Sequence, residues 1–304
     1  MQAKPTWDVL IPAFNASRFI EECIASVLIQ SHRPDRIIVY DDGSSDDTAT
    51  LAEHYGSCEV IRGRENLGVG ASRQELLMHS SAEWVLFLDA DDVLLPFASE
   101  VALAELREAH ALDLVSFLET SFAVPPSAIE NPRERPLTFD QVWWRNTIVS
   151  SAAFIRRESA LRAGGYSNER RLIDYDMWLR LLSLDSAAGK IVETPVVARY
   201  ISAETITGDV VPAVREQLRL IRIYAPRLTL GPPNSRLWRR RLFELWWRGF
   251  KRHVKYGRDP RQFIPMTELH AGPKSHALDL TLRSHLAMIL FRLTPVRRLL
   301  RLDR

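Results

Sequence analysis

Short apolar runs alternate with segments of helical spacing through the first 90 residues, and this alternation restricts the possible folds more than any other feature. Strands separated by helices of about 10 to 15 residues indicate βαβ units and a mostly parallel sheet, and continuous apolar strands fit a sheet covered on both faces. We therefore predict an α/β fold, with Ser17 as the N-cap of its first helix. The expected strands are residues 7–12, 36–40, 60–61 and 84–88, and the expected helices are 17–30, a segment from 44 onward, and 70–80.

The chain continues with further strands, at 113–119, 152–156 and 191–200, a helix at 173–184 and a Pro-rich charged loop at 125–136. A boundary near residues 205–212 separates this body from a helical, basic tail. Its 304 residues, 46% of them hydrophobic, are enough for a proper buried core. We expect two domains, 1–205 and 206–304.

Charge is distributed unevenly along the chain. The net charge is +2, but the segment from residue 236 onward holds 17 Lys+Arg and 5 Asp+Glu, so it carries 17 − 5 = +12 and residues 1–235 carry 2 − 12 = −10. A basic tail on an acidic body suggests an anionic surface as its partner. The two cysteines do not suggest a disulfide framework, and the polar start shows no secretory signal, so the cytoplasm is the expected location.

Polar residues follow three of the expected strands, at 13–15, 41–42 and 89–92. In open α/β sheets, ligands bind at the carboxyl ends of the strands. The pattern therefore predicts one site at one edge of the sheet.

Asp89 and Asp91 follow a buried strand directly, and residues two apart on a strand point to the same side. Unshielded carboxylates this close repel by about 1 to 4 kcal/mol, which a hard divalent cation relieves. The alternative is a turn whose aspartates cap the next helix. Spacing alone leaves both open.

Three further segments admit a binding role and a structural one. Asp41 and Asp42 can accept from a uracil imide or ribose hydroxyls, or form an Asx-turn. Arg73 follows two glycines and can pair with phosphate or with an aspartate, or be a surface arginine. Asp174 opens a helix, where it is either a general base or a residue favoured by the helix dipole.

Together these segments resemble glycosyltransferase family 2. The resemblance covers roughly residues 6 to 205, and the ordered set is more specific than any single motif. The segments that carry it are 9–15, 38–46, 66–73, 87–92, 156–157, 164–166 and 174–180.

The resemblance implies a GT-A-type, Rossmann-like fold and an inverting transfer from a nucleotide-diphosphate sugar, most often UDP-linked, with Mg²⁺ or Mn²⁺. It implies that Asp174 is the catalytic base and that Asp91, with Asp89, binds the metal. Two departures from the family pattern stand out, since Ile173 occupies a position that is often Glu, and residues 199–204 contain no histidine. The implied donor-nucleotide contacts are Pro12, Phe14, Asn15, Asp41, Asp42, Arg73 and Asp89, with Asp41 preferred over Asp42 for binding the nucleobase.

The tail shows helical spacing over residues 236–256, with a basic arc opposite an apolar, aromatic one. Residues 286–302 are similar, although Pro295 and the arginines exclude a spanning helix there. Such helices can lie on an anionic membrane, or pack their apolar side on the body. No nucleic-acid recognition motif accompanies the charge. The basic arc consists of Arg240, Arg241, Arg248, Lys251, Arg252 and Lys255.

The predicted activity is transfer of a sugar to a glycan or lipid-linked acceptor in cell-surface polysaccharide or glycoconjugate synthesis. The protein is expected in the cytoplasm, where its basic tail can bring it to the inner face of the membrane as a peripheral protein. One alternative is a metal-dependent nucleotidyltransferase, but residues 13–16 are not its usual glycine- and lysine-rich phosphate loop. A second is a non-catalytic protein that binds sugar nucleotides.

Overall fold

The computed structural model describes residues 4–121, 132–167, 171–199, 210–228, 235–255 and 263. The chain divides into two compact units, Met1–Ile201 and Ser202–Arg304. The predicted boundary near residues 205–212 falls largely outside the described residues, and so do the expected strand end at residue 200 and the second amphipathic segment, 286–302.

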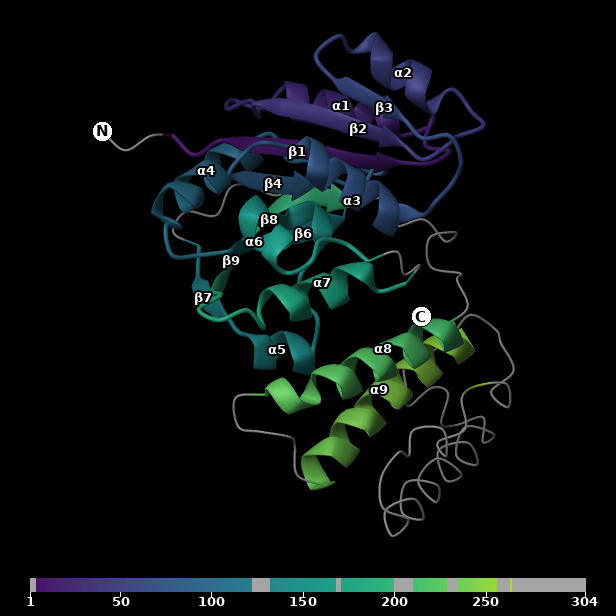
Figure 1. Cartoon of the computed structure of the whole chain (residues 1–304), viewed down its shortest axis with the longest axis vertical. Coiled ribbons are helices and arrows are strands. Elements are labelled where there is room, and N and C mark those ends of the chain that lie inside the picture. Colours follow the sequence, from purple (N-terminus) through teal and green to yellow (C-terminus); the bar gives the residue numbers. More distant parts are fainter. Residues whose placement is uncertain are drawn as a thin grey trace. The chain divides into compact units, whose positions relative to one another are not determined.

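The first unit is built on a sheet whose first half is parallel (Figure 1). Its strands lie in the order β3-β2-β1-β4, and every one matches an expected apolar run. Residues on β1 alternate between the faces, so that Val9 and Ile11 join the core cluster beneath helices α1 and α4. These elements are β1 Trp7–Ala13, α1 Ile20–Leu28, β2 Arg36–Asp41, α2 Thr48–His54, β3 Glu59–Arg62, α3 Val69–His79, β4 Trp84–Phe87 and α4 Ala98–Glu108.

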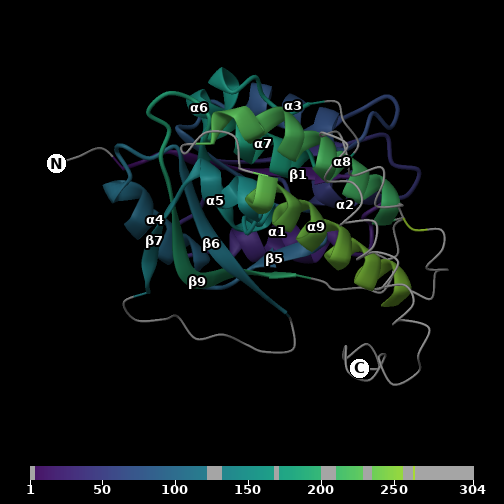
Figure 2. The ribbon, with the colours of Figure 1, turned by 90° about the horizontal axis from the view of Figure 1, so that it is seen from below.

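The second half of the sheet is mixed. Strand β8 runs antiparallel to β4 and β6, and β9 pairs in parallel with β6 but antiparallel with β5 and β7. Figure 2 shows α3, α6 and α7 on one side of the sheet and α1 on the other. The remaining elements of this unit are β5 Asp92–Leu94, β6 Leu114–Ser121, β7 Glu134–Leu137, α5 Phe139–Trp144, η1 Ser150–Ala152, β8 Ala153–Arg156, α6 Arg157–Arg162, α7 Ile173–Leu181 and β9 Gly189–Arg199.

This arrangement confirms the predicted α/β class with helices on both faces. The described strands form four parallel and four antiparallel pairs, so the sheet is more evenly mixed than the sequence indicates. The loop prediction for residues 125–136 is wrong at its end, because residues 134–136 belong to β7, while 125–131 lie outside the described residues. Strand β7 pairs with β9 alone, and such an edge strand tolerates Pro136.

The prediction of Ser17 as an N-cap is also wrong. Helix α1 begins at Ile20, three residues later, and the N–H of Ser17 instead donates to Asp46 Oδ2 at 3.1 Å. The loop after β1 is thus tied to the loop after β2. A local capping pattern was outweighed by a hydrogen bond across 29 residues.

The second unit contains α8 Val210–Tyr224, the 3₁₀ helix η2 Ala225–Arg227 and α9 Ser235–Lys255. A Cβ on Gly249 would lie 2.6 Å from Val214 Cγ2, so glycine permits the close approach of α9 to α8. The helix expected at 236–256 is confirmed, but Arg241 is fully buried and does not belong to a solvent-facing basic arc. Among the residues that the structure describes, no helix is long and apolar enough to cross a membrane.

Candidate active site

A cavity of about 640 Å³ lies at the carboxyl ends of β1, β2 and β4. Eight of the nine predicted site residues line it, and Asp41 is the exception. The start of helix α7 adds a further part of the lining, with Leu172, Ile173 and Asp174. The predicted residues that line it are Pro12, Phe14, Asn15, Asp42, Arg73, Asp89, Asp91 and Asp174.

On the β2 side, polar atoms are already paired with backbone N–H groups. Asp42 accepts from the N–H of Leu67 at 3.0 Å and of Gly68 at 2.8 Å, so its carboxylate holds the glycine-containing loop in place. Asn15, at a left-handed φ of 47°, accepts from the N–H of Ser45 at 2.9 Å. This side of the cavity is a fixed backbone frame.

Asp41 is buried like its neighbour Asp42, but its Oδ1 has no hydrogen-bond partner among the described residues. A buried acceptor without a donor is costly unless a ligand or water completes it. The two adjacent aspartates at the end of β2 therefore have different tasks, one structural and one with bonding capacity to spare.

Asp46 belongs to the same loop and is stabilised as an anion. Limited burial opposes its ionisation, but hydrogen bonds from Thr48 and Ser17 outweigh this and lower the pKa of Asp46 to about 2. The Thr48 hydroxyl and the N–H of Ser17 both donate to it.

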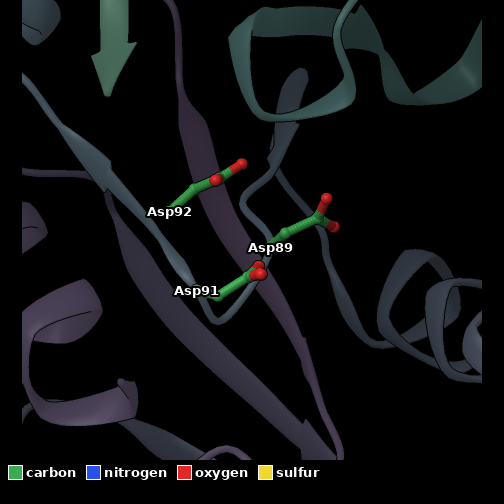
Figure 3. Close-up of side chains that lie close together, drawn as sticks. All are labelled: Asp89, Asp91 and Asp92. Carbon is green, nitrogen blue, oxygen red and sulfur yellow. The ribbon is translucent and has the colours of Figure 1, made fainter. Parts of the chain in front are cut away.

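The turn after β4 carries three carboxylates that project to one side (Figure 3). One oxygen from each of Asp89, Asp91 and Asp92 lies within 4.8 Å of the others. Burial, reinforced by the charge of Asp89, raises the pKa of Asp91 and raises that of Asp92 to about 7. Crowded, partly desolvated oxygen ligands of this kind suit a hard divalent cation.

Asp92 was not among the predicted ligands. It starts β5 and is 2% exposed, and its Oδ2 lies 3.5 Å from Arg199 Nε on the neighbouring strand β9. The sequence signal that could have found it was the third acidic residue of the turn itself.

Asp174 lies in the first turn of α7, whose start is strained by Leu172 at a left-handed φ of 52°. The preceding chain is held by Arg180, whose guanidinium donates to the carbonyls of Ala163 and Gly165 and pairs with Asp176 at 2.9 Å. The Asp174 side chain is 32% exposed, yet burial raises its pKa despite the opposing charge of Arg73. Asp176 thus braces the loop, whereas Asp174 faces the cavity.

Trp143 and Trp144 are adjacent residues at the end of α5, and aromatic side chains of this kind can stack on a sugar ring or pack in a core. Trp143 is 1% exposed and its carbonyl accepts from the Tyr175 hydroxyl at 2.8 Å. Neither tryptophan lines the cavity. The core role is therefore the one that the structure supports for Trp143.

The fold is shared with solved glycosyltransferases of the GT-A class. S. aureus TarS 1–349, solved in complex with UDP-GlcNAc, is similar with a TM-score of 0.60 and 17% identity, over 92% of this chain and 81% of that one. The mannosyltransferase PcManGT from Pyrobaculum calidifontis, solved with GDP-Man and Mn²⁺, is similar with a TM-score of 0.57 and 17% identity, over 97% of this chain and 83% of that one. These similarities show that the chain has the GT-A fold.

Sequence comparison names the family. The family model for glycosyl transferase family 2 matches residues 8–165, so the chain belongs to that family. It is 29% identical over 186 residues to chondroitin synthase from Escherichia coli, a match that covers 58% of this chain and 26% of that longer protein. The family resemblance and the transferase class predicted from the motifs are confirmed.

Proposed function

We propose that the protein transfers a sugar from a nucleotide-diphosphate sugar, UDP-linked, to a hydroxyl of a glycan or lipid-linked acceptor, with inversion at the anomeric carbon. One observation carries this proposal: the acidic turn after β4 and the Asp174 carboxylate line the same cavity. A donor anchored at the turn would present its sugar toward α7. Family membership supports the reaction class and the use of a nucleotide sugar.

A divalent cation, Mg²⁺ or Mn²⁺, fits the acidic turn. Asp91 and Asp89 would hold it, with Asp92 as the third protein carboxylate, and the raised pKa values of Asp91 and Asp92 mark groups that lack enough donors of their own. When bound, the cation stabilises charge on the departing diphosphate. Asp92 would take the place, as a metal ligand, of the histidine that the family often has and that residues 199–204 lack.

The nucleotide would lie along the β1 and β2 ends of the cavity. Pro12, Phe14 and Asn15 line that wall, and Phe14 is 48% exposed, which leaves its ring available to a ligand. Asp41, with its unpaired Oδ1, would accept from the uracil imide, while Asp42 holds the loop that forms the adjoining wall. Asp41 is proposed for this role although it is not among the residues that line the cavity.

Asp174 would act as the general base. The acceptor hydroxyl passes its proton to the Asp174 carboxylate as its oxygen forms the new bond to the anomeric carbon, and the bond from that carbon to the diphosphate oxygen breaks on the opposite side. Burial raises the pKa of Asp174, which increases its affinity for that proton. In-line attack of this geometry inverts the anomeric configuration.

The acceptor is proposed to be a growing polysaccharide or glycoconjugate, on or near the inner face of a membrane. The similarity to a chondroitin synthase supports the first point. The exposed Arg240, Arg248 and Arg252 on α9 support contact with an anionic surface, as the uneven charge of the chain does.

The test combines donor binding with turnover. UDP-, GDP- and dTDP-sugars are screened by thermal shift with and without Mn²⁺, and release of the nucleotide with water as acceptor is then followed for the wild type and Asp174→Asn. We expect a Mn²⁺-dependent rise in Tm with UDP-sugars, retained in Asp174→Asn, and a turnover reduced by about 1,000-fold in the variant. Binding without turnover in the wild type would instead indicate a non-catalytic sugar-nucleotide-binding protein.

A further inference from the structure

Arg73 joins two parts of the cavity lining. Its Nη2 donates to Asp89 Oδ1 at 2.5 Å and its Nη1 donates to Asp174 Oδ1, so one guanidinium holds the first residue of the acidic turn and the proposed base. These carboxylates come from positions 16 and 101 residues away in the chain. A planar fork of this kind suits two acceptors at a defined spacing.

The three side chains line the same cavity but differ in how far they are exposed. The Arg73 side chain is 3% exposed, whereas those of Asp89 and Asp174 are 33% and 32% exposed. Arg73 thus contributes little exposed surface to the cavity lining, and its two terminal nitrogens donate to the carboxylates. A side chain that binds a diphosphate has to offer its donors to the cavity.

Two aromatic rings fix the guanidinium in this place. Its central carbon lies 5.9 Å from the ring centre of Phe87 and 5.7 Å from that of Tyr166, and the two rings meet edge to face at 4.9 Å. Cation–π contact with desolvated rings stabilises the charged form where it stands. Burial opposes that charge, but Asp174 and Asp89 outweigh it and raise the pKa of Arg73, so it stays cationic.

We infer that Arg73 is a positioning residue, which sets the distance and orientation between the metal-binding turn and the Asp174 base and does not bind the donor phosphates. The inference rests on the proposed function, because it assigns how the base of that reaction is held. Of the roles that the sequence leaves open for Arg73, this one follows from its pairing with aspartates, and it replaces the donor-nucleotide contact that the family resemblance implies. A base misplaced by about 1 Å loses rate without losing donor affinity.

Arg73→Met and Arg73→Lys test this role beside Asp174→Asn. Arg62→Met serves as the matched control, since Arg62 is an exposed arginine paired with Glu53 outside the cavity. The Kd of UDP in saturating Mn²⁺ is measured by calorimetry, and the rate of UDP release from the UDP-sugar is measured at saturating donor. Folding is checked by circular dichroism and Tm.

We expect Arg73→Met to keep the Kd of UDP within about threefold and to lower the saturated rate by about 100-fold, with about tenfold of that recovered in Arg73→Lys. If Arg73→Met does not fold, the lysine variant carries the same comparison, because one ammonium cannot hold both carboxylates in the same geometry. Arg62→Met should match the wild type.

Two results would overturn the positioning role. One is a Kd of UDP raised tenfold or more at an unchanged saturated rate, which would make Arg73 a phosphate ligand. The other is a wild-type rate in both Arg73 variants. A wild type that releases no UDP from any UDP-sugar would instead contradict the proposed function, so the two failures are distinguishable.

Discussion

Two aspartate clusters lie at the ends of β2 and β4, two strands of one sheet that flank β1, and they are stabilised in opposite ways. At the end of β2, Asp42 and Asp46 accept hydrogen bonds from backbone N–H groups and a hydroxyl, and the pKa of Asp46 falls to about 2. At the end of β4, Asp91 and Asp92 are crowded by Asp89 and by burial, and the pKa of Asp92 rises to about 7. Aspartates at the carboxyl ends of strands thus form a rigid hydrogen-bonded frame after β2. After β4 they form a cluster whose negative charge the protein only partly neutralises.

The difference is set by the donors that surround each cluster. Loops after β1 and β3 bring N–H groups to the β2 end, at Ser17, Leu67 and Gly68. At the β4 end, the cluster has three carboxylates and Asp174 adds a fourth. Only two arginines, Arg73 and Arg199, pair with this group among the described residues. An acidic cluster is a candidate metal site where the protein itself supplies too little positive charge, and this criterion cannot be evaluated from acidic spacing alone.

The largest effect is expected from a substitution that removes a carboxylate from the β4 cluster. Asp91→Ala should abolish the Mn²⁺-dependent rise in Tm with UDP and lower nucleotide release from the UDP-sugar by about 100- to 1,000-fold, because charge on the leaving diphosphate is no longer stabilised. Asp47→Ala, an exposed aspartate of the β2 loop, is the control and should match the wild type. Equal activity in both variants would contradict a metal-binding role for Asp91.

The next effect concerns the β2 cluster as a frame. Asp42→Ala leaves the N–H groups of Leu67 and Gly68 without their acceptor and should lower the free energy of unfolding by about 1 to 3 kcal/mol. Asp41→Asn should leave the unfolding free energy nearly unchanged but weaken UDP binding by about tenfold, because Asn would offer a donor toward the uracil imide. Urea unfolding and calorimetry on the pair separate the two roles. Equal loss of stability in both would contradict the division.

A smaller effect sharpens the comparison through pH. In metal-free buffer with EDTA, Asp92 holds its proton in the folded state up to pH about 7 but loses it near pH 4 when unfolded. Its contribution to stability is therefore fully present below pH about 4 and is lost as the pH rises through 7. Asp92→Asn should raise Tm at pH 8 by about 2–4 °C and leave it unchanged at pH 4.5. An increase of the same size at both pH values would show that ionisation is not its cause.

The smallest effect has the opposite sign. The folded pKa of Asp46 is about 2, below its unfolded value, so its contribution is present above pH about 4 and is lost as the pH falls toward 2. Asp46→Asn should lower Tm by about 1–2 °C at pH 6, and the difference should vanish near pH 2. Thermal scans of Asp92→Asn and Asp46→Asn over one pH series should show the Tm differences from the wild type changing with pH in opposite directions. Parallel curves would mean that both are hydrogen-bonded alike.

Much of the first half of the fold was predictable because its information is local. The apolar runs at 7–12, 36–40, 60–61 and 84–88 correspond to β1 to β4, and a parallel sheet necessarily brings their carboxyl ends to one edge. The acidic turns at that edge therefore predicted a binding site there. The mixed half was less readable, since short strands such as β5 and β7 are defined by their partners on β9 and carry little pattern of their own.

The sequence alone determined that this chain is a family 2 glycosyltransferase. The family's motifs are short segments, and their residues and their order can be read directly from the sequence. Only the tertiary structure decided how the motif residues divide their tasks. It buried Arg73 between two carboxylates distant in sequence, added Asp92 to the acidic turn, and buried Arg241 in the second unit. Burial and long-range pairing set the ionisation and availability of a side chain, and neither is encoded in the spacing of neighbouring residues.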